Sequence, residues 1–173
     1  MDRYWILLGM MGAGKTSVGR ALAEHSGRPF RDTDTLLQNR FGRPVSQIFK
    51  VYGEAAFRAH ETSILRTLIP ERAVLSTGGG IVAREENWEE MRRLGTTIYL
   101  EVREDVLVDR LENSKKRRPL LEVDDWQGRV SDLLTARKPL YEQADLRVDV
   151  TECNVHEAVE RVLLALERVG EAP

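Results

Sequence analysis

Short apolar segments recur along the chain and are separated by longer amphipathic stretches. The apolar segments lie at residues 4–8, 29–31, 73–76, 97–102 and 146–150. Apolar runs of this length, bounded by polar and turn-forming residues, are typical of buried strands. Because these runs alternate with helical patterns, the sequence predicts an α/β fold in which a parallel sheet is wrapped by helices.

The last amphipathic stretch shows the helical period most clearly. Its apolar positions are Val155, Val159, Val162, Leu163 and Leu166, and its polar positions include Glu157, Glu160, Arg161 and Glu167. A helix with one apolar stripe buries that stripe, so we expect this helix to close the core from one side. No internal repeat or low-complexity linker interrupts the chain, which predicts a single domain over residues 1–173.

A glycine-rich segment directly follows the first predicted strand. Residues 9–16 read Gly-Met-Met-Gly-Ala-Gly-Lys-Thr, which fits the pattern G-x-x-x-x-G-K-[ST]. Glycines let the backbone curl with its N–H groups pointing inward, and a helix that starts near Lys15 adds the positive end of its dipole. We expect Lys15 to reach the outer phosphates of a nucleotide and the Thr16 hydroxyl to bind Mg²⁺. An ordinary strand-to-helix turn is the alternative, but the strand before the loop and the helical pattern after it favour a nucleotide site.

Two aspartates follow the second predicted strand. Many nucleotide-binding loops work with a metal-binding aspartate at the end of another apolar strand, yet residues 73–76 are followed by Thr77 and three glycines. Asp32 and Asp34 are therefore the candidates for supporting Mg²⁺ and for taking the proton of an attacking hydroxyl. A helix N-cap is the alternative for this pair. Glu101, in the fourth predicted strand, is a rival metal-associated acid.

Three arginines, Arg58, Arg118 and Arg137, are candidates for binding an anionic acceptor or the phosphates. Arg58 has Glu61 three positions further along, so it forms either a surface ion pair or a guanidinium held at the core edge for a substrate carboxylate. Arg137 lies next to a proline-kinked helical stretch, and taken alone it is expected to be a solvated side chain. Residues 78–80 are three consecutive glycines, which allow either close approach of a ligand to the backbone or a tight turn.

Residues 112–127 combine a basic run that contains Arg118 with a cluster of acidic residues. Pro119 and the poor apolar periodicity argue against a continuous helix in this segment. From charge alone it is either a lid over the phosphates or a solvated loop.

Composition narrows the remaining possibilities. The net charge of −2 gives no general attraction to nucleic acid or to an anionic membrane, and no apolar run approaches the roughly 18 residues that cross a bilayer. The chain shows no secretory leader pattern at its start, so we expect a cytoplasmic protein. The lone Cys153 excludes an internal disulfide and suggests a packing role. His25, His60 and His156 share no spacing and are expected to be structural or exposed.

Taken together, these motifs resemble the shikimate kinase family of P-loop kinases, which is related to the nucleoside monophosphate kinases. The motifs occur in the family's order over nearly the whole chain: residues 9–20, Phe-x-Asp-x-Asp at 30–34, Gly-Glu-x-x-Phe-Arg-x-x-Glu at 53–61, Gly-Gly-Gly at 78–80, Arg-Pro-Leu-Leu at 118–121 and Arg-x-Pro-Leu-Tyr at 137–141. The resemblance implies a three-layer fold with a five-stranded parallel sheet in the order 2-3-1-4-5. It also implies transfer of the ATP γ-phosphoryl group to the 3-hydroxyl of shikimate, a step toward chorismate and the aromatic amino acids.

The resemblance further implies roles for individual residues. ATP would be bound by Gly12, Ala13, Gly14, Lys15, Thr16 and Ser17, with Arg110 and Asn154 on the adenine side and Arg118 on the phosphates. Mg²⁺ would be held by Thr16 and, through water, by Asp32. Shikimate would be bound by Asp34, Arg58, Gly79, Gly80 and Arg137, with Asp34 as the candidate to receive the proton. Residues 33–61 would form the acceptor-binding region and residues 112–127 a mobile lid, in a protein expected to be a monomer. The family often has proline where this chain has Val155.

Two other interpretations stay open at this point. A related P-loop kinase for gluconate or a nucleoside monophosphate would share the loop and lid, but would not need Asp34, Arg58 and Arg137 to converge on a carboxylated ring. A nucleotide-binding switch without an acceptor would leave these arginines and aspartates without a purpose, and the chain lacks the Asn-Lys-x-Asp guanine signature.

Overall fold

A computed structural model describes residues 2–171, so the first residue and the last two residues of the predicted domain lie outside the described part. Its centre is a sheet of five parallel strands: β1 (Tyr4–Leu8), β2 (Phe30–Asp32), β3 (Val74–Ser76), β4 (Gly95–Glu101) and β5 (Leu146–Asp149). The strand order is β2-β3-β1-β4-β5, which confirms the predicted topology. Each crossover returns the chain to the same edge of the sheet, so all five strands end on one side.

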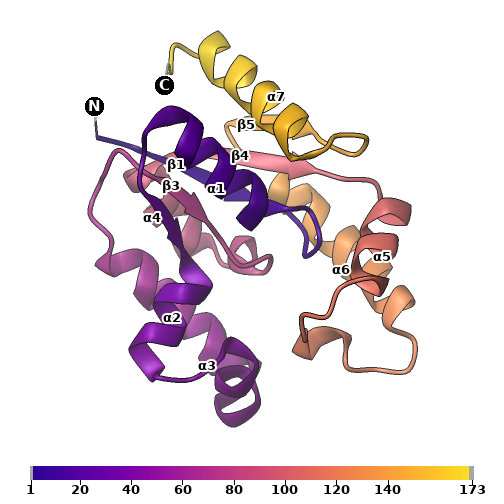
Figure 1. Cartoon of the computed structure of the whole chain (residues 1–173). Coiled ribbons are helices and arrows are strands. Elements are labelled where there is room, and N and C mark those ends of the chain that lie inside the picture. Colours follow the sequence, from indigo (N-terminus) through magenta and orange to yellow (C-terminus); the bar gives the residue numbers. More distant parts are fainter. Residues whose placement is uncertain (1, 172–173) are drawn as a thin grey trace.

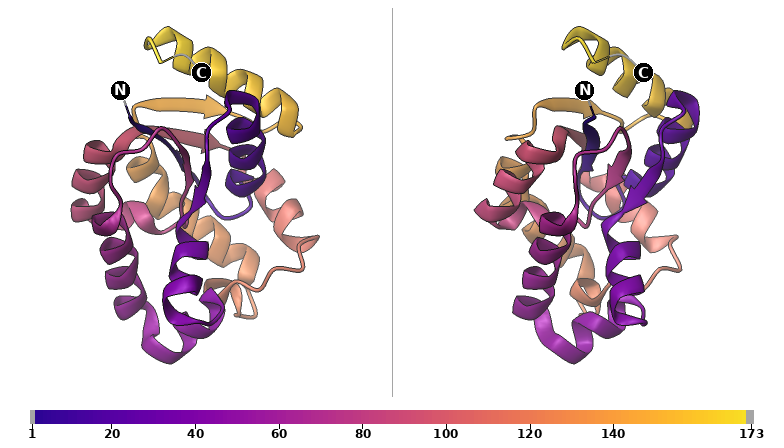
Figure 2. Two further views of the ribbon diagram at one scale, coloured as in Figure 1. Left: turned by 60° about the vertical axis from the view of Figure 1, so that its left-hand side comes forward. Right: turned by 90° about the vertical axis from the view of Figure 1, so that its left-hand side faces the viewer.

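Helices cover both faces of the sheet. They are α1 (Lys15–Ser26), α2 (Thr33–Phe41), α3 (Val45–Thr67), α4 (Glu85–Leu94), α5 (Glu104–Glu112), α6 (Trp126–Tyr141) and α7 (Val155–Arg168), with single 3₁₀ turns at Ile81–Ala83 and Pro119–Leu121. Figure 1 and Figure 2 show α1 and α7 together on one face, α4 and α6 on the other, and α2 and α3 projecting past the carboxyl ends of the strands. Helix α3 is bent at Gly53, whose φ of 79° suits a residue without a Cβ atom.

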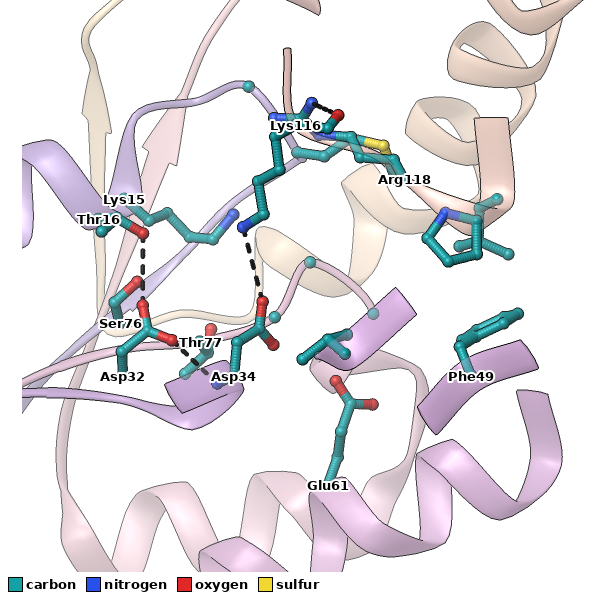
Figure 3. Close-up of a pocket in the computed structure, with 18 of the residues that line it drawn as sticks. Lys15, Thr16, Asp32, Asp34, Phe49, Glu61, Ser76, Thr77, Lys116 and Arg118 are labelled. Carbon is teal, nitrogen blue, oxygen red and sulfur yellow. Dashed lines mark hydrogen bonds and ion pairs between the residues drawn. The ribbon is translucent and has the colours of Figure 1, made fainter. Parts of the chain in front are cut away.

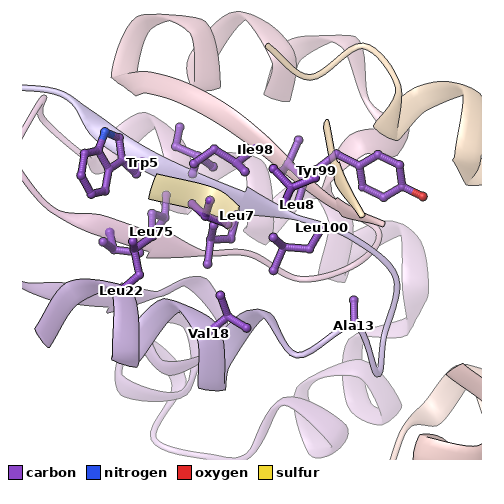
Figure 4. Packing of buried hydrophobic residues seen from close by; sticks show 14 of the residues in the cluster. Trp5, Leu7, Leu8, Ala13, Val18, Leu22, Leu75, Ile98, Tyr99 and Leu100 are labelled. Carbon is purple, nitrogen blue, oxygen red and sulfur yellow. The ribbon is translucent and has the colours of Figure 1, made fainter. Parts of the chain in front are cut away.

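The central strand β1 is buried along its whole length between β3 and β4. Val18 and Leu22 of α1 point up at the sheet beside Leu7, as Figure 4 shows. Strand β4 starts at Gly95, two residues earlier than its apolar pattern predicts. A Cβ atom on Gly95 would lie 2.0 Å from the Tyr4 carbonyl oxygen, so only glycine lets the two strands pair from that point.

Helix α7 has the predicted buried stripe, with one correction. Val159, Val162 and Leu166 are buried against the sheet side, but Val155 is exposed because it is the first residue of the helix and lies outside the stripe. Asn154 accepts a hydrogen bond from the backbone N–H of Glu157, and Glu157 accepts one from the N–H of Asn154, which is a capping box.

The remaining structural expectations concern cysteine, histidine and the 112–127 segment. Cys153 is a free thiol that packs against the core. His25 and His156 are exposed, while His60 packs on the ring of Phe41 with a centroid distance of 4.5 Å. Residues 113–125 contain only the short 3₁₀ turn, which confirms the expectation from Pro119 that this segment is not a continuous helix. The 3₁₀ turn contacts α3. Within residues 2–171, none of the helices is both long enough and apolar enough to span a bilayer.

Glu171 ties the end of the chain to the amino-terminal edge of the sheet. Its carboxylate accepts a hydrogen bond from Trp5 Nε1 at 2.8 Å and another from the Thr96 hydroxyl. These bonds satisfy a buried indole N–H and link α7 to β1 and β4.

We expect Glu171→Ala to lower the free energy of unfolding by about 1–3 kcal/mol, because charge-assisted hydrogen bonds are lost and the Trp5 indole N–H is left unpaired. Urea unfolding followed by circular dichroism measures this change. Glu167→Ala, an exposed position near the end of the preceding helix α7, is the matched control and should leave the midpoint unchanged. Equal midpoints for the two variants would contradict the assignment.

Candidate nucleotide and acceptor site

A cavity of about 420 Å³ lies at the carboxyl ends of the strands, between the glycine loop, α2, α3 and the 112–127 segment. Most of the predicted site residues line it: Gly12, Gly14, Lys15, Thr16, Ser17, Asp32, Asp34, Arg58, Gly79, Gly80, Arg118 and Arg137. Figure 3 shows Lys15, Asp34 and Arg118 converging on this cavity from separate elements. In the described part of the chain, the predicted residues Ala13, Arg110 and Asn154 lie outside this lining.

The glycine loop has the curled backbone that its sequence predicts. Gly12 and Gly14 have φ angles of 84° and 92°, values that L side chains rarely adopt. Lys15 Nζ donates hydrogen bonds to the carbonyl oxygens of Gly9 at 2.7 Å and Met10 at 3.1 Å, so the ammonium is held in the loop itself. Burial lowers the pKa of Lys15 to about 8, and the cations of Lys116 and Arg137 act in the same direction.

Asp32 caps α2 and also lines the cavity. Its Oδ1 accepts hydrogen bonds from the backbone N–H groups of Asp34 at 2.9 Å and Thr35 at 3.2 Å, which caps α2. Its Oδ2 faces the other way and accepts a hydrogen bond from Thr16 Oγ1 at 3.3 Å. The carboxylate therefore has one oxygen for the helix and one for the cavity.

The pair of Thr16 and Asp32 fits Mg²⁺. Mg²⁺ prefers hard oxygen ligands and is usually bound by one or two protein groups, several waters and the substrate phosphates. A hydroxyl and a carboxylate oxygen 3.3 Å apart beside a phosphate loop are such a donor set. Among residues 2–171, no group of three or more His, Cys, Asp or Glu side chains could form an all-protein metal site, so phosphates and water would have to complete the coordination.

Asp34 stands on the acceptor side of the cavity. Burial, and secondarily the negative charge of Asp32, raises the pKa of the Asp34 carboxyl above its usual range. Lys116, from the 112–127 segment, places its Nζ 3.9 Å from Asp34 Oδ2. The neighbouring Thr33 hydroxyl accepts a hydrogen bond from the Gly78 N–H at 3.1 Å, which fixes α2 against the glycine triplet.

Arg58 lies at the edge of the core, and its ion pair with Glu61 is not a surface pair. The distance from Arg58 Nη1 to Glu61 Oε2 is 2.7 Å, and the Glu61 side chain is only 1% exposed. Burial raises the pKa of Glu61, while the Arg58 cation opposes that rise. Arg58 Nη2 also lies 3.5 Å from Glu54 Oε1, so two carboxylates of α3 hold the guanidinium at the wall of the cavity.

Arg137 is buried, which corrects the expectation of a solvated side chain. It is 6% exposed, and its Nη1 has no hydrogen-bond partner within residues 2–171. Tyr141, one helical turn later, donates a hydrogen bond to the Gly79 carbonyl oxygen at 2.6 Å. Sequence reasoning assigned no role to Tyr141, although its spacing of four from Arg137 places both on one face of α6.

The glycine triplet lets these charged side chains approach the backbone. A Cβ atom on Gly80 would lie 2.3 Å from Arg58 Cζ, and one on Gly78 would lie 2.7 Å from Glu61 Oε1. On Gly79 the nearest atom would be Arg137 Nη1 at 3.4 Å. Close packing of side chains, in addition to ligand access, therefore accounts for the glycines.

Arg118 lines the cavity but is bonded to its own segment. Its Nη1 donates to Ser114 Oγ at 3.1 Å and to the Lys116 carbonyl oxygen at 3.0 Å. Sequence reasoning did not single out Lys116, whose ammonium extends from this segment toward Asp34, as Figure 3 shows. The signal that could have found it is its spacing of two from Arg118, because side chains two apart in an extended segment share a side.

The other candidates lie away from the cavity. Arg110 Nη1 donates to the Gly12 carbonyl oxygen at 3.2 Å, so it supports the outside of the glycine loop. Asn154 lies in the capping box of α7. Glu101 is paired with Arg147 at 2.6 Å and with Lys138 at 3.6 Å, outside the cavity lining, so it does not act as the rival metal-associated acid.

Comparison with known proteins identifies the family. The family model described as "Shikimate kinase" matches residues 11–167, most of the chain. The chain belongs to the shikimate kinase family. The shikimate kinase of Symbiobacterium thermophilum is 41% identical over 169 residues, which cover 96% of this chain and 97% of the relative. That of Thermodesulfovibrio yellowstonii is 37% identical over 166 residues and covers 95% of each chain.

Solved structures agree with the shikimate kinase assignment. A shikimate kinase from Acinetobacter baumannii in complex with shikimate superposes with a TM-score of 0.90 at 34% identity, covering 99% of this chain and 96% of that one. A gluconokinase from Sinorhizobium meliloti superposes with a TM-score of 0.66 at 21% identity, covering 98% and 94% of the two chains, which shows the shared fold alone.

The lowered pKa of Lys15 predicts that nucleotide binding takes up protons. In the free protein burial lowers the pKa of Lys15 to about 8, whereas phosphate oxygens beside the ammonium would favour the charged form. ADP affinity should be nearly constant below pH 7 and should fall as pH rises through 8, because more of the free enzyme must then gain a proton on binding. Calorimetry at pH 8 in buffers of different ionisation enthalpy measures the uptake. Lys15→Arg is the control: its guanidinium stays charged, so this variant should take up no proton on binding ADP. If the unmodified protein also takes up no proton, Lys15 does not bind the phosphates.

Proposed function

We propose that this chain transfers the γ-phosphoryl group of ATP to the 3-hydroxyl of shikimate, giving shikimate 3-phosphate and ADP. The observation that carries the proposal is the convergence of Asp34, Arg58 and Arg137 in the cavity that also contains the phosphate loop. Membership of the shikimate kinase family supports it, as does the likeness to a structure in complex with shikimate. In the same proposal the protein works as a monomer in the cytoplasm, with no nucleic-acid or membrane partner.

The arginines would bind the carboxylate of the acceptor. Guanidinium groups bind carboxylates with two parallel hydrogen bonds, which fixes orientation as well as affinity. The buried Nη1 of Arg137 has no partner in residues 2–171, and an acceptor oxygen would satisfy it. Glu61 holds Arg58 at 2.7 Å, so little side-chain entropy would be lost on binding.

The glycine triplet and Asp34 would hold the hydroxyl end of the acceptor. Without Cβ atoms, the backbone at Gly79 and Gly80 lets the ring approach closely, and its polar groups are available for a ring hydroxyl. Asp34, with its raised pKa, would accept a hydrogen bond from the reacting hydroxyl and then its proton. Asp34 would contribute mainly by positioning the hydroxyl, because a loose phosphoryl-transfer transition state needs little proton removal by a base.

The donor side would neutralise charge on the phosphates. Residues 12–17 would wrap the phosphates with backbone N–H groups, Lys15 would leave its carbonyl partners for them, and Arg118 would leave its own segment. Thr16 and Asp32 would hold Mg²⁺, which when bound neutralises and orients the phosphate oxygens. Residues 112–127 would act as a lid that excludes water as a competing acceptor. Arg110 and Asn154 would lie on the adenine side.

The test is ADP formation from Mg·ATP with shikimate, quinate, gluconate and AMP as parallel acceptors. We expect turnover with shikimate that exceeds the other three by orders of magnitude, because only a carboxylated ring of this hydroxyl pattern meets all three side chains at once. Turnover with gluconate or AMP instead would support the related small-molecule kinases. Slow hydrolysis insensitive to every acceptor would support a nucleotide switch.

Arg137→Met should separate acceptor binding from stability. We expect the acceptor KM to rise roughly ten- to hundredfold, since a charge-assisted pair contributes about 1.5–3 kcal/mol. Thermal stability should be equal or higher, because methionine removes a buried cationic group that lacks a partner. Acceptor saturation curves and thermal melts measure the two effects.

The neighbouring Lys138→Met is the matched control. Lys138 is 48% exposed and faces Glu101, away from the cavity, so its loss should leave the acceptor KM unchanged. If both variants saturate with acceptor like the unmodified protein, Arg137 does not bind the carboxylate.

A further inference from the structure

The basic run of the 112–127 segment has two sides. The backbone is extended at Arg118, and side chains alternate along an extended chain, so Lys116 and Arg118 share one side. Both line the main cavity. Lys115 is exposed and outside the lining. Arg117 also belongs to the lining, but it is 80% exposed and paired with Glu122 at 3.2 Å. Lys116 and Arg118 therefore share one side of the run and meet the cavity together, while Arg117 is paired within its own segment.

Of the two inward cations, Lys116 reaches further toward the reacting groups. Arg118 Nη1 is bonded to Ser114 and to the Lys116 backbone within the segment. The Lys116 ammonium instead lies 3.9 Å from Asp34 Oδ2, and Figure 3 shows its side chain descending to Asp34 on the side where Lys15 enters.

This position lies on the path that a transferred phosphoryl group must take. Lys15 and Thr16 mark the donor end of the path, and Asp34 marks the acceptor hydroxyl. A cation between them would meet the oxygens of the moving group, whose charge is spread over three equatorial oxygens in the transition state. The Lys116 ammonium already approaches one anion at this position, the Asp34 carboxylate.

We propose that Lys116 is a further catalytic residue, a second lid cation that binds the transferred phosphoryl group together with Lys15 and Arg118. The proposal rests on the proposed function. In the step concerned, the acceptor oxygen forms a bond to the γ-phosphorus while the bond from that phosphorus to the β,γ-bridging oxygen breaks. The electron pair stays on ADP, the hydroxyl proton passes to Asp34, and Lys116 keeps its own proton throughout. Its contribution is charge stabilisation that is stronger in the transition state than in the ground state.

The variants Lys116→Met and Lys115→Met test the proposal as a matched pair. For Lys116→Met we expect kcat to fall about tenfold to hundredfold, with the shikimate KM and the affinity for ADP alone changed less than about threefold. Lys116→Arg should recover part of kcat, and Lys115→Met should behave like the unmodified protein. Both lysines are exposed, so neither change should prevent folding, which thermal melts check.

A binding measurement gives a readout that does not depend on turnover. The complex of ADP with aluminium fluoride mimics the transferring group, and Lys116→Met should weaken it about as much as kcat falls. A kcat within about twofold of the unmodified protein would overturn the proposal. So would an unchanged kcat with a lowered shikimate KM, since Lys116 would then merely compete with the acceptor for Asp34. If the unmodified protein does not phosphorylate shikimate, the proposed function is wrong. Comparing the affinity of the unmodified protein and of Lys116→Met for ADP with aluminium fluoride would still test the role of Lys116.

Discussion

The active cavity depends on how closely charged side chains from α3 and α6 approach the backbone of residues 78–80. Arg58 and Glu61 lie where Cβ atoms on Gly80 and Gly78 would stand, at 2.3 Å and 2.7 Å. Any side chain there would push the Arg58 ion pair outward and open the floor of the cavity. Tyr141 fixes the same turn from the opposite side through the Gly79 carbonyl oxygen. The triplet is thus the point at which α3, α6 and the end of β3 are held in register with one another.

The same packing leaves the cavity with buried charges whose pairing is incomplete. Arg137 Nη1 and Glu61 Oε1 have no hydrogen-bond partner within residues 2–171, and Lys15 has a pKa lowered to about 8 by burial. Charged groups in such surroundings cost free energy until an opposite charge arrives. A carboxylated acceptor and a polyphosphate donor would supply charges at these two ends. These groups therefore lower the stability of the free protein, but they are already oriented when substrates bind.

Local patterns in the sequence predict those features that depend on local structure. The strands follow from apolar runs and the glycine loop from its spacing, since both are determined within a few residues. Burial of Arg137 is not predictable in this way, because it results from contact with residues 78–80, far away in the sequence. The early start of β4 is similar, because it depends on the close approach of Gly95 to Tyr4, which is far away in the sequence. The family resemblance placed Arg137 in the site where its own pattern did not.

Residues 112–127, the proposed lid, show how a segment with little regular secondary structure can still place its side chains specifically. Its net composition suggests a solvated loop, and charge alone does not distinguish that from a functional element. The extended backbone at Arg118 places Lys116 and Arg118 on one side of the segment, where both line the cavity, while Arg117 pairs with Glu122. Because the 3₁₀ turn at Pro119–Leu121 contacts α3, the position of Lys116 and Arg118 is tied to α3 as well as to the glycine loop side of the cavity. If the segment closes over the phosphates as proposed, the same movement would bring these cations to the acceptor hydroxyl.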